Sequence, residues 1–443
     1  MADRKNITSG RARRAIKIGG LASQVGSSYL WTSIRRPFLN AARYERELLD
    51  THLRNARRIV EGSKQLRGAF MKLIQMLSTR ADLLPGEAID ILRTTQSSVP
   101  PMDYKLISQQ IRREFSKSPD QLFASFETEA FAAASLGQVH RARLKTGEEV
   151  AVKIQYPGVD ATVEQDLRNL KLLLRTLQAI AGDVMRQKID TKTIYAELEE
   201  RLREELDYVN EARNINQFHK LLDGDPDILI PRVIKDLSSR RVLTMTYLDG
   251  YPLADVFGGA SDPELRAWVA SKYYKLVWRQ ILEFGVLHTD PQPGNYLVTY
   301  HPHLAILDFG SVRRFSDQVR RLSVTLAQSI LRHDDRGVGA ALTKLGYLER
   351  GQDPAPLVKV IYILFEPVIT DRPFHPDEYD AIGKAATVGE MAFEHKLYKS
   401  PRHSIFLLRA LIGLDGIMKG LAVKQNYCAM FRECVRQAVR ATA

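Results

Sequence analysis

The stretch that decides the fold is Leu287–Gly310, which reads LHTDPQPGNYLVTYHPHLAILDFG. Two short apolar runs, Tyr296–Thr299 and Leu304–Leu307, flank a turn that contains Pro302. Short apolar runs on either side of a turn predict an antiparallel β-hairpin. The stretch is therefore expected to fold as loop, strand, turn, strand and loop.

Three polar side chains flank this hairpin. Asp290 and Asn295 lie five positions apart before it, and Asp308 follows it, so pairing of the strands would bring Asp308 back beside Asn295. Phosphoryl transfer uses such a set, because one Asp orients or deprotonates the acceptor while Asn and a second Asp hold Mg²⁺ on the phosphates. The loop resembles the kinase H-x-D-x-x-x-x-N pattern, and Asp308-Phe309-Gly310 resembles the kinase D-F-G. Together they predict kinase-like chemistry.

The composition is typical of a soluble globular protein with two or three domains. The chain has 443 residues, of which 44% are hydrophobic and 26% charged. Its two cysteines, Cys428 and Cys434, fit no metal-ligand spacing and exclude a disulfide framework, so we expect a reducing, cytoplasmic compartment. Charged residues interrupt Ile405–Val423, which is expected to be a buried helix rather than a membrane span. Residues 1–31 lack the apolar region of a secretory signal.

Positive charge is concentrated near the N-terminus. The net charge is +12, and residues 1–80 alone contain 17 Lys and Arg against 5 Asp and Glu. Such an arm predicts an anionic partner, such as a membrane surface, a nucleic acid or an acidic protein, although a solvated helix face has the same composition. Apolar residues in Arg11–Leu30 recur at helical spacing, which favours a helix that docks on a membrane surface or a partner. A partly disordered arm is the alternative, because Gly19-Gly20 weakens the helix.

A strand-rich stretch follows, in which Phe123–Glu129, Gly137–Leu144 and Glu149–Gln155 read as strands. The connection Ala130–Gln138 occupies the position where kinases have a glycine-rich loop over the nucleotide phosphates. Alanines replace those glycines here, and each Cβ restricts the backbone, so the loop is expected to cover a nucleotide less flexibly. The loop residues expected to bind the nucleotide are Ala132, Ala133, Ala134, Ser135 and Gln138.

Lys153 closes the run Val150-Ala151-Val152-Lys153, which is similar to the kinase V-A-I-K strand whose lysine contacts the α- and β-phosphates. Alternation along a strand places Ala151 and Lys153 on one face and the two valines on the other. An edge strand that uses lysine to block aggregation is the alternative interpretation.

Further along, Thr191–Leu221 is expected to form a long helix rich in carboxylates, with Asp207 and Glu211 on one side. A kinase-like lobe needs one such carboxylate to pair with the strand lysine. After the strand Arg241–Tyr247 the chain is expected to form a hinge, where backbone groups at Met245 and Leu248 would hold adenine. Beyond Gly310 the chain is expected to be mostly helical, without a further motif.

At this point the order of residues resembles a known family, the UbiB/AarF atypical kinase-like proteins. Four motifs carry the resemblance, which runs from about residue 68 to about residue 310. They are Lys72–Gln75 (similar to K-x-G-Q), Ala132–Gln138 (the alanine-rich loop), Glu205–Asp207 (E-x-D) and His288–Asn295 (similar to H-A-D-P-H-P-G-N). Ile74, Thr289 and Gln292 depart from the family pattern.

The resemblance implies a protein-kinase-like fold with an N-terminal extension over the active-site cleft, which obstructs protein substrates. It implies that Lys72 and Gln75 reach the nucleotide pocket and meet Glu205 and Asp207, while Glu211 pairs with Lys153. It also implies binding of ATP with Mg²⁺, ATP hydrolysis, and a role in isoprenoid quinone (ubiquinone) biosynthesis at membranes, where proteins of that pathway are candidate partners.

We therefore predict an α+β, bilobal protein-kinase-like fold with a helical N-terminal extension. Its expected parts are a basic helical arm (1–66), a helical extension (67–122), a β-rich N-lobe (123–247) and a helical C-lobe (248–443). Lys153, oriented by Glu211, would position the phosphates, Asp290 would orient or deprotonate the acceptor, and Asn295 and Asp308 would hold Mg²⁺. No nucleic-acid partner is expected, and any membrane contact would be peripheral.

Two other functions fit part of the pattern. One is a small-molecule phosphotransferase of the aminoglycoside or choline kinase type, which shares the catalytic loop but does not need the Lys72–Gln75 motif. The other is a non-catalytic nucleotide-binding scaffold of a membrane-associated complex, which Ile74, Gln292 and the alanine loop would suit.

Overall fold

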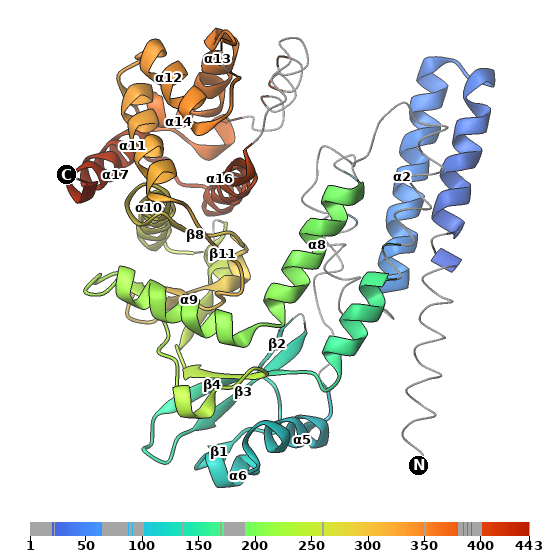
Figure 1. The fold of residues 1–443 in the computed structure, drawn as a ribbon, viewed down its shortest axis with the longest axis vertical. Coiled ribbons are helices and arrows are strands. Elements are labelled where there is room, and N and C mark those ends of the chain that lie inside the picture. The colour runs from blue at the N-terminus through green and yellow to red at the C-terminus, as the bar shows by residue number, and fades with distance from the viewer. Residues whose placement is uncertain are drawn as a thin grey trace. The chain divides into compact units, whose positions relative to one another are not determined.

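The computed structural model describes residues 20–63, 102–168, 191–258, 261–349, 351–379 and 401–442, with positions 22 and 135 left out and six isolated helical positions added (Figure 1). Lys72, Gln75 and Ser135 lie outside the described residues. The chain divides into two compact units. The first comprises residues 1–210 and 233–247, and the second comprises residues 211–232 and 248–443.

An antiparallel helix pair opens the described part of the first unit (Figure 1). Residues 23–35 form the first helix, η1 (Arg36–Phe38) follows, and α2 (Ala41–Ser63) forms the second. A ladder of polar contacts joins the two: Ser28 with Asn55, Tyr29 with His52, and Thr32 with Thr51. Of the helix predicted over Arg11–Leu30, residues 11–19 and 22 lie outside the described residues, and the described part runs past Leu30 to residue 35.

The first unit also contains an antiparallel sheet in the order β1-β3-β4-β6, with β2 paired to β3. The strands are β1 (Ser125–Phe126), β2 (Ala132–Ala134), β3 (Gly137–Arg143), β4 (Glu149–Gln155) and β6 (Val242–Thr246). The predicted turn between β3 and β4 forms with Gly147 at φ +94°, where Gly147 N donates to Leu144 O.

Helices cover one face of this sheet. Val150, Val152 and Ile154 of β4 are fully buried against Ile107 and Ile111 of α5 (Tyr104–Phe115). Residues 159–168 and α8 (Thr191–Glu205) add Val163, Leu198 and Leu202 to the same core. The apolar side of α5 is thus the face that packs on the sheet.

The helix expected over Thr191–Leu221 is in fact two helices, which corrects the sequence-based prediction. α8 ends at Glu205, and α9 (Tyr208–Leu221) begins after a break at Leu206-Asp207. The Asp207 carboxylate accepts a hydrogen bond from Asn210 N at 2.9 Å, the geometry of a helix N-cap. Asp207 therefore stands at the start of α9, and it does not share a helix face with Glu211 as expected.

The second unit is built on a mixed four-stranded sheet in the order β5-β10-β9-β7. Its strands are β5 (Ile228–Leu229), β7 (Gly250–Pro252), β9 (Tyr296–Thr299) and β10 (Leu304–Ile306). The predicted hairpin is confirmed, because β9 and β10 pair antiparallel with Ile306 opposite Tyr296. A further pair joins β8 (Val286–His288) to β11 (Val312–Arg314), and the sequence had not indicated β11.

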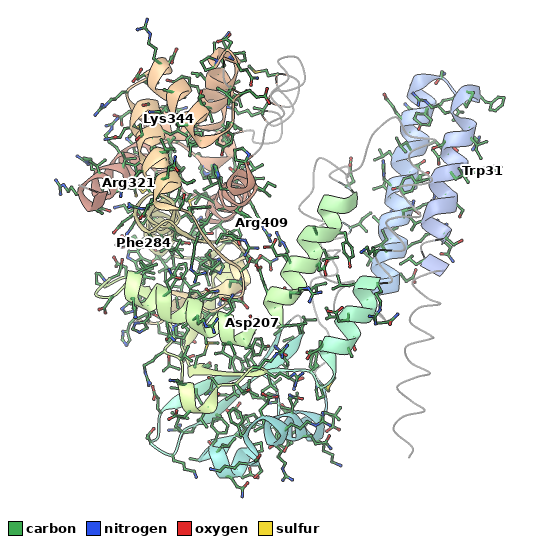
Figure 2. The ribbon with its side chains drawn as sticks, in the orientation of Figure 1. Trp31, Asp207, Phe284, Arg321, Lys344 and Arg409 are labelled. Carbon is green, nitrogen blue, oxygen red and sulfur yellow. The ribbon has the colours of Figure 1, made fainter. Side chains whose placement is uncertain are left out.

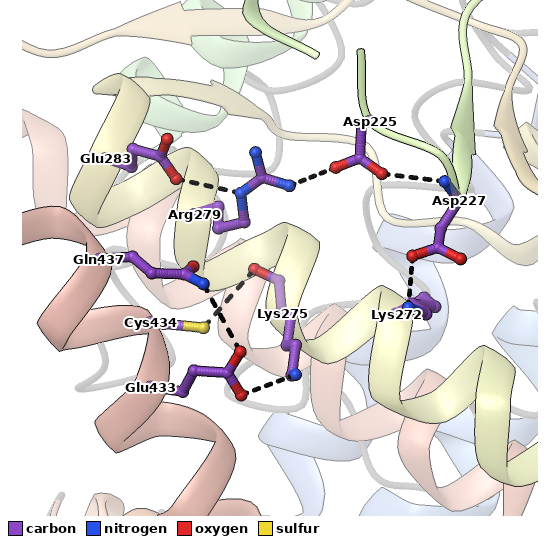
Figure 3. Close-up of polar contacts among 9 residues, drawn as sticks. All are labelled: Asp225, Asp227, Lys272, Lys275, Arg279, Glu283, Glu433, Cys434 and Gln437. Carbon is purple, nitrogen blue, oxygen red and sulfur yellow. Dashed lines mark hydrogen bonds and ion pairs between the residues drawn. The ribbon is translucent and has the colours of Figure 1, made fainter. Parts of the chain in front are cut away.

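Helix α10 (Pro263–Arg279), which Asp262 caps at its N-terminus, makes several polar contacts within the second unit (Figure 3). Arg279 forms ion pairs with Asp225 and Glu283, and Lys272 forms one with Asp227. Because Asp225 and Asp227 lie just before β5, these pairs tie that segment to α10. On another side Lys275 pairs with Glu433 of α17 (Tyr427–Thr442) at 2.7 Å. These contacts fix α10 between the sheet and the C-terminal helix.

As expected, the described part of the chain after Gly310 is mostly helical. The remaining described elements, before and after Gly310, are helices. They are α6 (Pro119–Leu122), η3 (Lys235–Leu237), η4 (Leu253–Val256), the π-helical η5 (Gln280–Phe284), η6 (Pro293–Asn295), α11 (Asp317–Leu331), α12 (Asp335–Leu345), α13 (Ala355–Leu364), α14 (Glu366–Ile369), η7 (Pro376–Glu378) and α16 (Arg402–Leu421). Of the helices within the described ranges, none combines the length and the apolar composition that spanning a bilayer requires.

Helix α16 differs from the buried helix that the sequence predicted. Ala410, Ile417 and Leu421 are buried, but Ile405, Leu408 and Ile412 are about half exposed. The apolar composition of the segment did not reveal that one of its faces is open to solvent.

Both cysteines are free and buried in α17. Burial raises the pKa of the Cys434 thiol to about 12, so this thiol stays protonated at neutral pH. The expectation that the cysteines form no disulfide is confirmed.

We predict that Gly137→Ala destabilises the first unit by about 1–3 kcal/mol. A Cβ at this position would lie 2.2 Å from the Ile154 backbone oxygen, so β3 and β4 would have to separate. Urea denaturation measures the effect. Gly20→Ala is the control, because nothing lies within 4 Å of its added Cβ. An equal denaturation midpoint for Gly137→Ala and the wild type would contradict the prediction.

Candidate functional site

Lys153 lies in the middle of the first unit's sheet. Its strand β4 pairs with β3 on one side and with β6 on the other, so the edge-strand alternative is wrong. The side chain is 8% exposed, and Nζ lies 5.1 Å from the ring centroid of Tyr208, in position for a cation–π contact. Lysines are almost never fully buried unless their charge is paired.

The alanine-rich segment forms a tight hairpin and not an open loop. Ala132 of β2 stands opposite Val139 of β3, and Ala134 stands opposite Gly137. Gln138 is 1% exposed, and its amide bonds to Met102 N at 2.7 Å and to His140 Nε2 at 2.8 Å. These bonds anchor the Gln138 side chain within the sheet, and a contact between Gln138 and a nucleotide stays a prediction.

The Glu205–Asp207 motif lies at the break between α8 and α9, on the same side of the sheet as Lys153. Gln155, two residues after Lys153 and so on the same strand face, donates from Nε2 to Leu206 O at 2.8 Å. This bond holds the break against the end of β4. Asp207 is exposed and labelled in Figure 2. The residues expected to meet this motif, Lys72 and Gln75, lie outside the described residues.

Three other predicted residues have well-defined places within their own units. Glu211 lies in the first turn of α9, where it is 1% exposed. Met245 of β6 is buried opposite Ala151 of β4, and Leu248 is half-buried directly after β6. Whether Glu211 pairs with Lys153, and whether Met245 and Leu248 hold adenine, stay predictions.

The loop around Asp290 and Asn295 is organised by the Asn295 amide. Asn295 Nδ2 donates to the backbone oxygen of Asp290 at 2.9 Å and to its carboxylate Oδ2 at 3.2 Å. Because the amide nitrogen faces Asp290, the side-chain oxygen of Asn295 is directed away from it. That oxygen is suited to bind a metal ion or to accept a hydrogen bond.

The hairpin brings Asp308 back to Asn295, as predicted. Leu307 N donates to Asn295 O at 2.9 Å, which extends the β9–β10 register by one residue. Gly310 N donates to Asp308 Oδ1 at 2.9 Å and so orients the carboxylate. The second unit therefore assembles Asp290, Asn295 and Asp308 at one end of the hairpin.

A buried histidine fixes the backbone of Asp308. His288 is 3% exposed, and its Nε2 lies 2.6 Å from Asp308 O. A carbonyl oxygen can only accept, so Nε2 carries the hydrogen and Nδ1 is the acceptor, 3.5 Å from the Tyr296 hydroxyl. Burial raises the pKa of Tyr296 well above its ordinary value, so this hydroxyl remains a donor.

Helix α9 contributes a second support to this region. Asn214, which is fully buried, donates from Nδ2 to Phe309 O at 2.8 Å. Arg314 of β11 donates to Asn214 Oδ1 at 2.8 Å and completes the amide's bonding. The sequence analysis missed both residues, because neither belongs to a local motif.

Arg409 of α16 is a further residue that the sequence analysis did not identify (Figure 2). Its Nη2 donates to Asp290 Oδ1 at 3.3 Å, and the two side chains are 22% and 16% exposed. One turn later on the same helix, Gly413 lies so close to Pro291 that a Cβ would be 1.9 Å from Pro291 Cγ. Segments far apart in the sequence thus meet at the Asp290 loop.

The donor set fits a magnesium ion bound partly through a nucleotide. Among the described residues, no group of three or more His, Cys, Asp or Glu side chains has the proximity of a metal site. Asn295 and Asp308 would thus offer an amide oxygen and one carboxylate. Mg²⁺ bound through substrate phosphates uses one or two carboxylates of the protein.

Comparisons with known proteins agree with this geometry. The sequence model of the ABC1 atypical kinase-like domain matches residues 94–342. The chain is 30% identical over 440 residues to the uncharacterized protein sll0095 of Synechocystis, covering 97% of this chain and 74% of that protein. It is 31% identical to ACTIVITY OF BC1 COMPLEX KINASE 7, a chloroplastic protein of Arabidopsis thaliana, and 29% identical to the mitochondrial atypical kinase coq-8 of Caenorhabditis elegans.

These relatives differ from the chain in length. The alignments cover 81% and 86% of this chain with the Arabidopsis and Caenorhabditis proteins, but only 50% of each relative. Among solved structures, Rv3197 of Mycobacterium tuberculosis in complex with erythromycin is similar, with a TM-score of 0.61 and 24% identity over 83% of this chain and 92% of that one. The predicted α+β, bilobal kinase-like fold is confirmed.

We predict that His288→Phe lowers the free energy of unfolding by about 1–3 kcal/mol, because the buried Asp308 carbonyl loses its donor. It should also weaken binding of the magnesium–nucleotide complex, since Asp308 is no longer held. Chemical denaturation and calorimetric titration measure the two effects. Tyr296→Phe removes the 3.5 Å contact to His288 and the hydroxyl's contact with Tyr273 but leaves the bond from His288 to Asp308 O, and it serves as the milder control. Equal behaviour of the two variants would refute the role given to His288 Nε2.

Proposed function

This chain belongs to the ABC1 atypical kinase-like family, also called UbiB/AarF, and from that premise we propose that it binds ATP with Mg²⁺ and works as a phosphotransferase or an ATPase. The observation that carries the proposal is the hairpin that unites Asp290, Asn295 and Asp308 within the second unit. A kinase-like activity follows from the family, whereas the nucleotide, the metal and the reaction are proposed here.

Each residue of the loop has a proposed role. Asp290 orients or deprotonates the acceptor, which is water in an ATPase and a hydroxyl compound in a phosphotransferase. Asn295 and Asp308 hold the metal ion, which neutralises charge on the phosphates. His288 and Gly310 keep the Asp308 carboxylate in place.

Lys153 is proposed to hold the α- and β-phosphates, with Glu211 as its orienting partner. Two local facts support this. Lys153 Nζ lies over the Tyr208 ring, and Glu211 is buried three residues further along the same helix as Tyr208. Positions three apart lie on one side of a helix.

Access to the γ-phosphate is proposed to depend on four residues that the family resemblance brings together: Lys72, Gln75, Glu205 and Asp207. The bond from Gln155 to Leu206 supports this, because it ties the Glu205–Asp207 break to the strand that carries Lys153. Ala132, Ala133, Ala134 and Ser135 are proposed to cover the phosphates, and backbone groups at Met245 and Leu248 to hold adenine.

We propose that the protein supports isoprenoid quinone biosynthesis, as the family resemblance implies, and that it works at a membrane surface. The exposed residues at one end of the helix pair support the proposal that the protein works at a membrane surface. Trp31, Ile34 and Phe38 are 63%, 54% and 84% exposed there, and Arg36 and Arg43 beside them are exposed as well. Aromatic side chains next to arginines suit the interface of an anionic bilayer. This interface tip, Trp31 to Arg43, would make the contact peripheral.

The two alternative functions have distinct signatures. A small-molecule phosphotransferase would keep its turnover after Lys72→Ala, because that class does not use the Lys72–Gln75 motif. A non-catalytic scaffold would bind ATP with Mg²⁺ and release no phosphate, with or without anionic vesicles and a quinone-precursor mimic.

We predict that Asp308→Asn and Asp290→Asn separate binding from turnover. Asp308→Asn should lower the Mg²⁺-dependent affinity for ATP by about tenfold or more, because a metal ligand loses its charge. Asp290→Asn should leave that affinity near the wild-type value and reduce turnover by about 10²–10⁴-fold. Calorimetry and a phosphate-release assay measure the two quantities. Unchanged ATP affinity in Asp308→Asn would refute the metal site.

A second prediction concerns the interface tip. Replacing Trp31 and Phe38 with Ser should reduce partition onto anionic vesicles by about tenfold or more, because each aromatic side chain contributes about 1.5–3 kcal/mol on burial. Vesicle co-sedimentation at low and high salt measures this. Tyr300→Ser is the control, since Tyr300 is 70% exposed in a turn of the second unit. Equal partition of the double variant and the wild type would contradict the proposal.

A further inference from the structure

Helix α16 is docked on the catalytic loop by a row of contacts from one of its faces. The Arg313 guanidinium lies 4.6 Å from the ring centroid of Phe406. Arg409 bonds to Asp290 at 3.3 Å, and Gly413 lies against Pro291. Further along, Gly258 N donates to Gly420 O at 3.2 Å. The helix thus contacts the Asp290 loop at Arg409 and Gly413, and it is held on either side of them by Arg313 and Gly258.

We propose that Arg409 is a positioning residue for the reaction, which holds the carboxylate of Asp290 toward the acceptor. This inference rests on the proposed function, because it assumes that Asp290 handles the acceptor. It assigns a role in catalysis to α16, which lies beyond residue 342, where the match to the family domain ends.

The bonding of Asp290 is the first argument. Asn295 Nδ2 reaches Oδ2 at 3.2 Å, and Arg409 Nη2 reaches Oδ1 at 3.3 Å, so the carboxylate is held from two sides. A carboxylate has about four lone-pair positions, so two such bonds fix its plane and leave room for the acceptor's proton. Losing one support would let the carboxylate rotate away from the acceptor.

The sequence of the loop is the second argument. Residues 289–295 read TDPQPGN and contain no Lys or Arg, so the loop has no cation of its own. A negative charge that is 16% exposed needs a partner from elsewhere in the fold, and Arg409 provides it. A planar guanidinium suits this task because it orients the carboxylate as well as neutralising it.

The fit between Gly413 and Pro291 is the third argument. A Cβ at position 413 would lie 1.9 Å from Pro291 Cγ and 2.4 Å from Pro291 Cβ. Proline is rigid, so a larger residue would push the loop away from the helix. Arg409 and Gly413 are four positions apart and lie on the same side of α16. Close packing at Gly413 therefore sets the distance over which Arg409 can reach Asp290.

The test compares three variants of α16 with the wild-type chain, by ATP affinity and by ATP turnover. Arg409→Gln should reduce kcat by about 10–100-fold with ATP affinity within about twofold of wild type, because misplacement of a catalytic group by about 1 Å can cost about 10²-fold. Arg409→Lys should recover part of the loss through its charge. Gly413→Ala should reduce kcat in the same way, although it changes no charge.

Lys419→Met is the matched control. Like Arg409, Lys419 is a residue of α16 that forms an ion pair, but its partner is Asp415 of the same helix, at 2.8 Å, and not a residue of the Asp290 loop. It should lower thermal stability about as much as Arg409→Gln and leave kcat unchanged. A wild-type kcat in Arg409→Gln, or equal losses of kcat in Arg409→Gln and Lys419→Met, would overturn the positioning role.

Asp290→Asn in the same assay separates this inference from the proposed function. If the wild type turns over ATP and Asp290→Asn does not, the proposed function stands, and the Arg409 variants alone decide the inference. If the wild type binds ATP without any turnover, the proposed function and the inference both fail.

Discussion

The site depends above all on the antiparallel pairing of β9 with β10. Asn295 and Asp308 are 13 positions apart in the chain, and only this hairpin makes them neighbours. The bond from Leu307 N to Asn295 O sets the register at which they meet. A slip of one residue would turn every side chain of β10 to the opposite face. Burial of Val298, Leu304 and Ile306 prevents such a slip, so the apolar core indirectly holds the polar site.

A comparable constraint acts in the first unit. The face of β4 that carries Val150, Val152 and Ile154 packs on α5, which leaves Lys153 and Gln155 on the other face. Gln155 then fixes the break between α8 and α9 through Leu206 O, and Lys153 lies over Tyr208 just after that break. The alternation of side chains along β4 therefore determines both where Lys153 lies and where the break between α8 and α9 is held.

Features that depend on local patterns could be predicted from the sequence. The hairpin and the strand β4 lie where their apolar residues placed them. The break at Leu206-Asp207 could not be predicted, because Glu205 and its neighbours have good helix propensity and the break depends on a bond from Gln155, 51 residues earlier. The bond between Gln138 and Met102 could not be predicted for a similar reason, since Met102 lies in a different segment. A motif places a residue in the sequence but does not show which atoms its side chain contacts.

Arg409 illustrates the same limit most clearly. It is 119 residues from Asp290, on a helix whose apolar residues suggested only burial. The structure shows that α16 has one face on the catalytic loop and another, with Ile405, Leu408 and Ile412, exposed. The docked face contacts the loop through Arg409 and Gly413, which are one helical turn apart. The geometry of Asp290 therefore depends on the position of a whole helix, and not on the eight-residue motif alone.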